Sequence, residues 1–377
     1  MKENFTNLWE LNKFPLTDLL GTYDSSIQVF DQALTISEKN GHVQLANIIP
    51  NEILYTESDY SYRTRSSPKS SNLINFFTNF LDDNTPQRVL NSIVDIGGND
   101  LTLAKILKPK TKECYVVDPL CSLIDGQKID NINVIGKKVE EVDLKVINPD
   151  VVVCRHTLEH IENPKVFLRQ LFEECPDNCI YIFEVPDFDC LLEGMRFDAI
   201  FHQHLHYFNL STITNLISEC GGVVTNHDYN FQGSCGGALF VSFTKSKQII
   251  PSIKIDISAK KKMIKKKIDY YKIHMSNLSN QIENLPKPIY GYGAGLMLAT
   301  YGYHLKTDFS FLEAIIDDDI TKDNTGYKNI PVIIRHPSKL EIPKDSSFII
   351  TSLENIRPIY NRLSSFRPRR VLTHIVS

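Results

Sequence analysis

Two turns in the first third of the chain, rich in glycine and acidic residues, carry the clearest chemical signal. The stretch DIGGND, residues 95–100, follows an apolar run, and its glycines allow the backbone to turn sharply and approach a ligand closely. The apolar run CYVV leads into Asp118, where a carboxylate can accept hydrogen bonds from both ribose hydroxyls of an adenosine. Together the two turns predict a site for a nucleoside-containing cofactor. The predicted contacts are Asp95, Gly97, Gly98, Asn99, Asp118 and Pro119.

The residue pattern favours S-adenosylmethionine over a nicotinamide dinucleotide as that cofactor. Thr102 stands where the dinucleotide fingerprint has its third glycine. Asp95, at the end of a strand, would repel a pyrophosphate but suits a zwitterionic ligand. A third turn, Arg155-His156 after the apolar run DVVVC, is expected at the same carboxyl edge and beside the cofactor. A glycine turn with a purely structural role is the alternative.

A second group of residues, the histidines at positions 202–206, offers acid–base chemistry. His202, His204 and His206 alternate, so they would share one face of an extended segment. An imidazole suits proton removal because its unperturbed pKa lies near neutrality. Metal binding and a structural role are the alternatives, and metal is disfavoured because no cysteine or carboxylate stands beside them. His160 is expected either to face the reaction cleft or to cap the following helix.

The elements that must position these groups alternate between apolar strands and helices. From residue 73, the helical runs are SNLINFFTNFLD, LTLAKIL, PKVFLRQLFEEC and STITNLISEC. The buried strands between them are SIVDI, CYVVD, DVVVCR, CIYIFEV and GALFVSFTK. Apolar strands separated by helices imply parallel pairing with both faces covered. We therefore predict an α/β doubly wound, Rossmann-like domain over residues 73–246.

Three further regions flank this domain. Residues 1–72 are polar with short apolar runs, and they predict an irregular lobe with one or two small strands. Residues 247–286 predict a long linker helix, because apolar residues recur there at heptad-like steps. The lysines of this helix would form a solvated face or, alternatively, a basic contact surface. Residues 287–377 predict a second, smaller Rossmann-like domain, in which YGYGAG precedes three aspartates.

The composition argues against several classes of function. The chain has 377 residues and a formal net charge of −4, which argues against a dedicated nucleic-acid binder. No apolar stretch is long enough to span a membrane and no signal-peptide core is present, so we expect a cytoplasmic protein. The eight cysteines all lie beyond residue 113 and are expected to be reduced, mostly buried thiols. The oligomeric state stays open, with a weak homo-oligomer as one option.

The order of the motifs resembles that of the S-adenosylmethionine-dependent sugar C-methyltransferases, which act on nucleotide-linked keto sugars. The resemblance runs over nearly the whole chain and is carried by GHVQLANIIPNEILYTESDYSYRTRSS, VDIGGND, VVDP, VVVCRHTLEHIENP, FEVPDF, FDAIFHQHLHYFN, YGYGAG and AIIDDDITKDNTG. It implies a small N-terminal zinc-binding domain, a central class I methyltransferase domain and a C-terminal Rossmann-like domain. It also implies a nucleotide-sugar substrate and a role in deoxysugar or glycan biosynthesis, without identifying the sugar.

The N-terminal region departs from the family pattern in its zinc ligands. Where the family usually has Cys-x-x-Cys-Gly, this sequence has SEKNG at residues 37–41, and it has no upstream cysteine pair. Without thiolate ligands no tetrahedral zinc site is expected there. We therefore expect the lobe to persist without metal, held by packing, and S-adenosylmethionine to be the cofactor, with no zinc.

The segment that resembles the family's catalytic motif departs from it as well. The typical Tyr-His-Glu-His reads Phe201-His202-Gln203-His204 here, so the tyrosine hydroxyl and the carboxylate are absent. His204 resembles the family's general base, whereas Gln203 can form hydrogen bonds but cannot accept a proton as a base. The expected catalytic residues are His204, His202, Gln203, His160 and Tyr62.

C-methylation needs a base that removes a proton next to a ketone and a donor that stabilises the resulting enolate oxygen. Tyr62 could donate to that oxyanion, and Arg63 and Arg65 could hold the phosphates of a nucleotide-sugar. The resemblance implies that the turn containing Gly293 and Gly295 cradles the nucleotide portion. An independent NAD site and a merely supporting domain are the alternatives there. O-methylation of a hydroxyl and a catalytically silent sugar-nucleotide-binding homologue are the competing functions.

Overall fold

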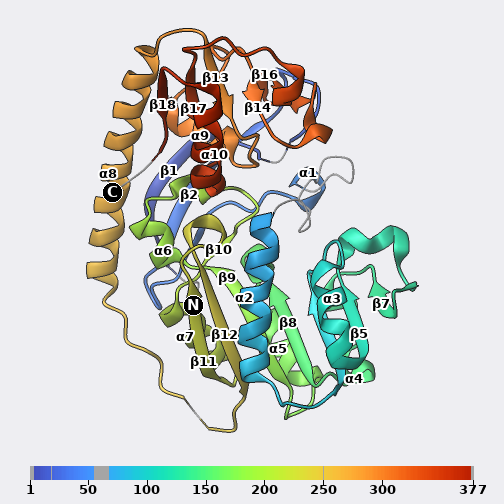
Figure 1. The fold of residues 1–377 in the computed structure, drawn as a ribbon. Helices are drawn as coiled ribbons and strands as arrows, with labels where there is room; N and C mark the ends of the chain where they lie inside the picture. The colour runs from blue at the N-terminus through green and yellow to red at the C-terminus, as the bar shows by residue number, and fades with distance from the viewer. Residues whose placement is uncertain (1–3, 18, 55–67, 249, 375–377) are drawn as a thin grey trace.

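The computed structural model describes residues 4–374, apart from residue 18, residues 55–67 and residue 249. Within these residues the chain forms three β-sheets, and a long helix connects the second sheet to the third (Figure 1). None of the helices in this part of the chain combines the length and the hydropathy that a membrane crossing requires. All eight cysteines are free thiols, and five of them are buried.

An antiparallel sheet forms the N-terminal lobe. Its order is β1 (Phe5–Pro15), β2 (Val29–Ser37), β3 (Val43–Leu45) and β10 (His206–Tyr207), and the short α1 (Asn51–Leu54) follows β3 in the chain. The lobe is more regular than the polar sequence indicated, because Trp9, Leu11 and Phe14 are buried between exposed polar residues of β1. β10 comes from the central part of the chain, so its pairing with β3 ties the histidine-rich segment to the lobe.

The central sheet has eight strands in the order β11-β12-β9-β8-β4-β5-β7-β6. In chain order these are β4 (Leu90–Ile96), β5 (Thr111–Val117), β6 (Lys128–Ile129), β7 (Ile132–Ile135), β8 (Val151–Arg155), β9 (Ile180–Pro186), β11 (Gly222–Asn230) and β12 (Ala238–Lys245). The five neighbouring strands β9, β8, β4, β5 and β7 run parallel to one another. β12 lies between β9 and β11 and is antiparallel to both. This arrangement confirms the predicted doubly wound α/β sheet.

Helices cover both faces of the central sheet, as its apolar strands require. The helices are α2 (Pro68–Asn84), α3 (Thr102–Leu107), α4 (Leu144–Ile147), α5 (Pro164–Glu174), α6 (Phe188–Glu193) and α7 (Leu210–Glu219). Ile93 and Val153 pack in one core with residues of α2 and α3, whereas Val94 and Val152 pack in another with residues of α5 and α7. Successive residues of a strand thus face opposite helix layers, and the side chains on both faces of the sheet are buried.

The linker helix α8 (Ile257–Glu283) carries the predicted apolar stripe. Its buried residues are Ile264, Ile268, Tyr271, Met275, Leu278 and Ile282. In Figure 1 the helix runs along one side of the molecule, beside the lobe and the C-terminal domain. Lys261 pairs with Glu38 of the lobe, and Lys267 pairs with Glu193 of α6. Some of the lysines of α8 are therefore used in contacts within the protein.

A second, mostly parallel sheet forms the C-terminal domain. Its order is β15 (Gly326–Tyr327), β16 (Ile330–Arg335), β14 (Ile315–Ile316), β13 (Ile289–Tyr292), β17 (Ser347–Ile350) and β18 (Arg370–Leu372), accompanied by α9 (Leu298–Leu305) and α10 (Ile356–Leu363). Trp9 of the lobe stacks on His304 of α9, with 5.1 Å between ring centroids, and meets Tyr271 of α8 edge-on. One hydrophobic core therefore joins lobe, linker helix and C-terminal domain.

The first turn of α8 offers a test of how the linker helix is stabilised. The Asp256 side chain accepts a hydrogen bond from the Ala259 N–H at 2.9 Å and so caps the helix. Asp256→Ala is expected to lower the free energy of unfolding by about 1 kcal/mol, measured by urea denaturation. Asp269→Ala, an exposed change within the same helix, is the matched control and is expected to have a smaller effect.

His304 makes this shared core sensitive to acid. Its Nε2 is buried without a hydrogen-bond partner among the described residues, and burial lowers its pKa to about 4, although Asp198 opposes the shift. The unfolded chain takes up the proton near pH 6.5, so the contribution of His304 to stability is present above that pH and is lost between about 6.5 and 4.

His304→Phe keeps a flat ring against Trp9 but removes this titration. From pH 7 to 4.5 the wild type is expected to lose about 2–3 kcal/mol more unfolding free energy than the variant. Denaturant titrations at both pH values measure the difference, with the exposed His227→Phe as the control. Parallel losses in wild type and His304→Phe would contradict the assignment.

Candidate active site

The glycine turn after β4 has no room for larger side chains. Gly97 adopts a φ of +79°, and a Cβ placed there would lie 2.0 Å from Thr157 Oγ1. A Cβ on Gly98 would lie 2.7 Å from Val116 Cγ1. The two glycines therefore let the turn close against the ends of the neighbouring strands β5 and β8, as expected for a backbone that comes close to a ligand.

Asp118 holds this turn from the end of β5. Its Oδ2 accepts a hydrogen bond from the Asn99 N–H and its Oδ1 one from the Leu120 N–H, both at 2.8 Å. Pro119 begins the short helical turn that Asp118 caps. The predicted cofactor residues Gly97, Gly98, Asn99, Asp118 and Pro119 are thus brought together at one edge of the sheet.

Asp95 lies beneath the same turn and is almost completely buried. Its Oδ2 has no hydrogen-bond partner among the residues that the structure describes. Burial and the nearby Asp118 carboxylate raise the pKa of Asp95 to about 7, although Arg155 opposes the shift. A positively charged ligand group beside it would stabilise the ionised form.

Arg155 and His156, at the end of β8, belong to a buried ion-pair network. Glu184 of β9 accepts hydrogen bonds from Arg155 Nε and, at 3.0 Å, from His156 Nε2. Burial raises the pKa of Glu184, but Arg155 and His156 outweigh it and hold the value below the ordinary range. Burial lowers the pKa of His156, whereas Glu184 and Glu159 raise it, with a net rise to about 9. Glu184 was not among the predicted site residues, although it is the one charged residue of an otherwise apolar strand.

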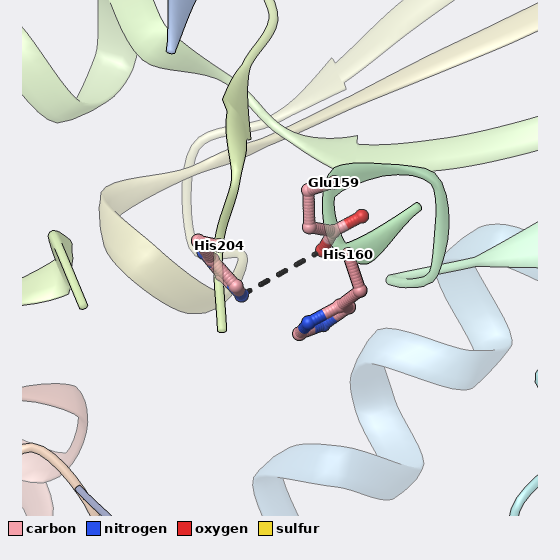
Figure 2. A group of neighbouring side chains, drawn as sticks. All are labelled: Glu159, His160 and His204. Carbon is pink, nitrogen blue, oxygen red and sulfur yellow. Dashed lines mark ion pairs between the residues drawn. The ribbon is translucent and has the colours of Figure 1, made fainter. Parts of the chain in front are cut away.

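Glu159, His160 and His204 lie together next to this network (Figure 2). Glu159 Oε1 is 3.4 Å from His156 Nδ1 and 3.9 Å from His204 Nε2. The imidazoles of His160 and His204 meet almost at right angles, with 4.8 Å between their centroids. A carboxylate therefore does stand beside these histidines, which corrects the expectation from sequence that none does. Glu159 was missed because it reaches His204 only through the fold.

Both histidines of this cluster are held in a form that can accept a proton. His160 Nδ1 lies 2.8 Å from the carbonyl oxygen of Gln203, to which it donates as a neutral ring, so its Nε2 is the basic nitrogen. Burial lowers the pKa of His160. Burial, followed by the charges of His160 and His156, holds the pKa of His204 well below its ordinary value. A neutral imidazole is the form that a general base needs.

The predicted common face of His202, His204 and His206 is wrong. Residues 202 and 203 form a turn, closed by a hydrogen bond of 3.0 Å from the His204 N–H to the Phe201 carbonyl, so the segment is not extended. His202 is fully buried, with its Nε2 3.2 Å from the Phe14 carbonyl. His206 Nδ1 lies 3.0 Å from His42 Nε2. Two of the three histidines therefore join the segment to the N-terminal lobe.

The remaining predicted site residues lie elsewhere. Gln203 accepts a hydrogen bond of 3.1 Å from Thr17 Oγ1, which directs its side chain to the lobe. Gly293, with a φ of +99°, and Gly295 lie in the turn after β13 of the C-terminal sheet. There Asp317 accepts a hydrogen bond from the Ala294 N–H at 2.7 Å. Tyr62, Arg63 and Arg65 lie outside the described residues.

The turn at residues 37–42 stands where the resemblance noted in the sequence would place two zinc-binding cysteines. Ser37 Oγ accepts hydrogen bonds from the Lys39 and Asn40 N–H groups, at 3.1 and 3.3 Å. Asn40 Oδ1 accepts one from the His42 N–H at 3.0 Å. The side chains at the two cysteine positions thus close the turn themselves, and they do not fit a zinc ion held by thiolates.

Comparisons with known proteins place a methyltransferase domain in the middle of the chain. Residues 63–226 match the family model described as "Methyltransferase domain". No curated protein sequence gives a significant match. Among solved structures, the N-methyltransferase NodS from Bradyrhizobium japonicum WM9 is 12% identical, with a TM-score of 0.36 over 48% of this chain and 99% of that one. A putative methyltransferase from Bacillus halodurans C-125 is 11% identical, with a TM-score of 0.36 over 46% and 100%.

The residues at the edge of the central sheet fit S-adenosylmethionine. The turn at Gly97 and Gly98 is a cradle that a Cβ would fill, and Asp118 presents its carboxylate where ribose hydroxyls are recognised. The buried, unpartnered oxygen of Asp95 supplies negative charge for a cationic group. Together with the match over residues 63–226, these features assign an S-adenosylmethionine-dependent methyltransferase domain to this part of the chain.

Proposed function

We propose that the enzyme transfers a methyl group to a carbon next to the ketone of a nucleotide-linked keto sugar. The observation that carries the proposal is the pair of neutral histidines, His160 and His204, beside the buried Glu159 and adjoining the cofactor residues Arg155 and His156. Methylation of a carbon acid requires such a base, whereas many heteroatoms react without one. The order of motifs shared with sugar C-methyltransferases supports the substrate class.

S-adenosylmethionine, when bound, supplies an electrophilic methyl group on a positively charged sulfur. His204 Nε2 would accept the proton from the substrate carbon, and the electron pair of that C–H bond would pass into an enolate. The Glu159 carboxylate, 3.9 Å from Nε2, would stabilise the imidazolium that forms. In the same proposal Tyr62 donates to the enolate oxygen and Arg63 and Arg65 hold the substrate phosphates. The turn that contains Gly293 and Gly295 contributes to binding the nucleotide portion of the substrate.

A substrate screen with trideuteromethyl-labelled S-adenosylmethionine tests this proposal. Keto-sugar nucleotides and the corresponding hydroxy-sugar nucleotides are incubated with the enzyme, and mass spectrometry and NMR locate the transferred methyl group. We expect a C-methylated product from a keto sugar and none from its reduced counterpart. A methyl group found on oxygen, with the reduced sugars as good substrates, would replace the proposal with O-methylation.

A further inference from the structure

The cluster of Glu159, His160 and His204 has the composition of a metal site. Two imidazoles and one carboxylate form the ligand set of several catalytic zinc centres, in which a fourth position stays open. We propose that these three side chains bind one divalent transition-metal ion, with Zn²⁺ as the expected occupant. Metal binding is a property of the side chains themselves and does not depend on the identity of the methyl acceptor.

The positions of the three side chains support this inference. Their ligand atoms all lie within 4.8 Å of one another, and the side chains converge on one space in Figure 2. The ligands of a tetrahedral zinc ion lie about 3.3 Å apart, so binding would draw these atoms closer together by about 1.5 Å at most. The two backbone segments are already tied together, because the Leu205 N–H donates to the Glu159 carbonyl at 2.8 Å.

Glu159 is the strongest single indication. Its side chain is 1% exposed, and neither carboxylate oxygen has a hydrogen-bond partner among the described residues. Burying a carboxylate without hydrogen bonds is unfavourable, and coordination of a cation would satisfy it. His156 Nδ1 lies 3.4 Å from Glu159 Oε1, but the same imidazole also pairs with Glu184 through its Nε2. The incoming ion would therefore meet a carboxylate that is only partly compensated.

His160 has the arrangement that is common for metal-ligating histidines. Such residues usually donate the ring N–H that does not face the metal to a carbonyl or carboxylate, which fixes the tautomer and the ring orientation. His160 Nδ1 lies 2.8 Å from the Gln203 carbonyl oxygen, so the Nε2 lone pair is the one directed away from the backbone. Gln203 thus orients a ligand through its backbone while its side chain binds Thr17 in the lobe.

Metal binding has a consequence for catalysis, and this consequence rests on the proposed function. A metal bound to His204 Nε2 would use the lone pair that the base needs, so the metal-bound enzyme could not take a proton from the substrate. We therefore expect Zn²⁺ to inhibit methyl transfer and a chelator to restore it.

The direct test is a Co²⁺ titration of the full-length, chelator-treated protein, followed by visible absorption and then by displacement with Zn²⁺. We expect one equivalent of Co²⁺ per chain and displacement by one equivalent of Zn²⁺. Glu159→Gln and His204→Gln should each weaken binding at least about tenfold. His227→Gln, a change of an exposed histidine, is the matched control and should bind like the wild type.

The outcomes separate this inference from the proposed function. Unchanged S-adenosylmethionine binding shows that the Gln variants are folded, so equal Co²⁺ affinity in wild type and folded variants would overturn the metal site. The absence of a Co²⁺ spectrum in the wild type would also overturn it. If Co²⁺ binds as expected but Zn²⁺ accelerates methyl transfer, the inhibitory consequence is overturned and the site stands. Failure of every keto-sugar substrate would refute the proposed function without affecting the Co²⁺ result.

Discussion

Asp118→Ala is expected to weaken the binding of S-adenosylmethionine by about 10²-fold. A hydrogen bond to a charged group contributes about 1.5–3 kcal/mol, and the upper part of that range corresponds to this change in affinity. The substitution also removes the acceptor of the Asn99 and Leu120 N–H groups, so the glycine turn loses its attachment to β5. Both effects reduce affinity, and neither is expected to impair the distant C-terminal domain.

Isothermal titration calorimetry of wild type and variant with S-adenosylmethionine measures this effect. Asp118→Asn retains one acceptor oxygen and is expected to fall between the two. Asp130→Ala, which removes an exposed carboxylate paired with Lys105, controls for the loss of one negative charge. Binding by Asp118→Ala within twofold of the wild type would show that the cofactor is held elsewhere.

His204→Gln is expected to lower kcat by about 10²- to 10⁴-fold, the usual contribution of a positioned general base. Glutamine is polar and of similar size, but it cannot accept a proton at neutral pH. Because the hydrogen bonds that hold the glycine turn come from Asp118 and not from His204, S-adenosylmethionine affinity should stay within about twofold of the wild type. A loss of turnover with retained cofactor binding distinguishes a chemical role from a structural one.

His160→Gln is the informative comparison for this prediction, since its imidazole lies 4.8 Å from that of His204. The exposed His227→Gln should retain full turnover. Steady-state kinetics on the three variants, with the substrate identified by the screen, provide the measurement. If His204→Gln turns over normally and His160→Gln does not, the base is His160.

The cofactor turns could be predicted from sequence because short-range features determine them. An apolar run followed by glycines or an aspartate places those residues at the carboxyl end of a strand, and parallel strands bring such ends to one edge. Asp95, Gly97 and Asp118 therefore meet as expected. The apolar stripe of α8 was predictable for a similar reason, since helical spacing alone selects its buried residues.

The cluster of Glu159, His160 and His204 could not be predicted in the same way, because it depends on contacts between residues distant in sequence. The turn at residues 202 and 203 and the pairing of β10 with β3 direct His202 and His206 toward the lobe. His204 alone of the three reaches Glu159, which lies 45 positions earlier in the chain. Periodicity within the segment contains no information about either event.

The N-terminal lobe shows a different limit of sequence reasoning. Residues 1–72 are polar and rich in asparagine, serine, tyrosine and threonine, which suggested irregular structure, yet a few large residues suffice to bury one side of β1. Trp9 does so by packing on His304 and Tyr271, which belong to the linker helix and the C-terminal domain. The stability of the lobe therefore comes from distant parts of the chain, and no cysteine is needed at the turn that Ser37 and Asn40 close.

Exchange of the substrate's α-proton tests the central claim, base-catalysed C-methylation, most directly. A keto-sugar nucleotide is incubated in deuterated water with enzyme and S-adenosylhomocysteine, which lacks the transferable methyl group, and its mass is followed over time. We expect the wild type to introduce deuterium next to the ketone and His204→Gln to do so at least about 10²-fold more slowly. Methylation of the same compound by the wild type, at a carbon or an oxygen, without any exchange or loss of an α-proton would contradict the account.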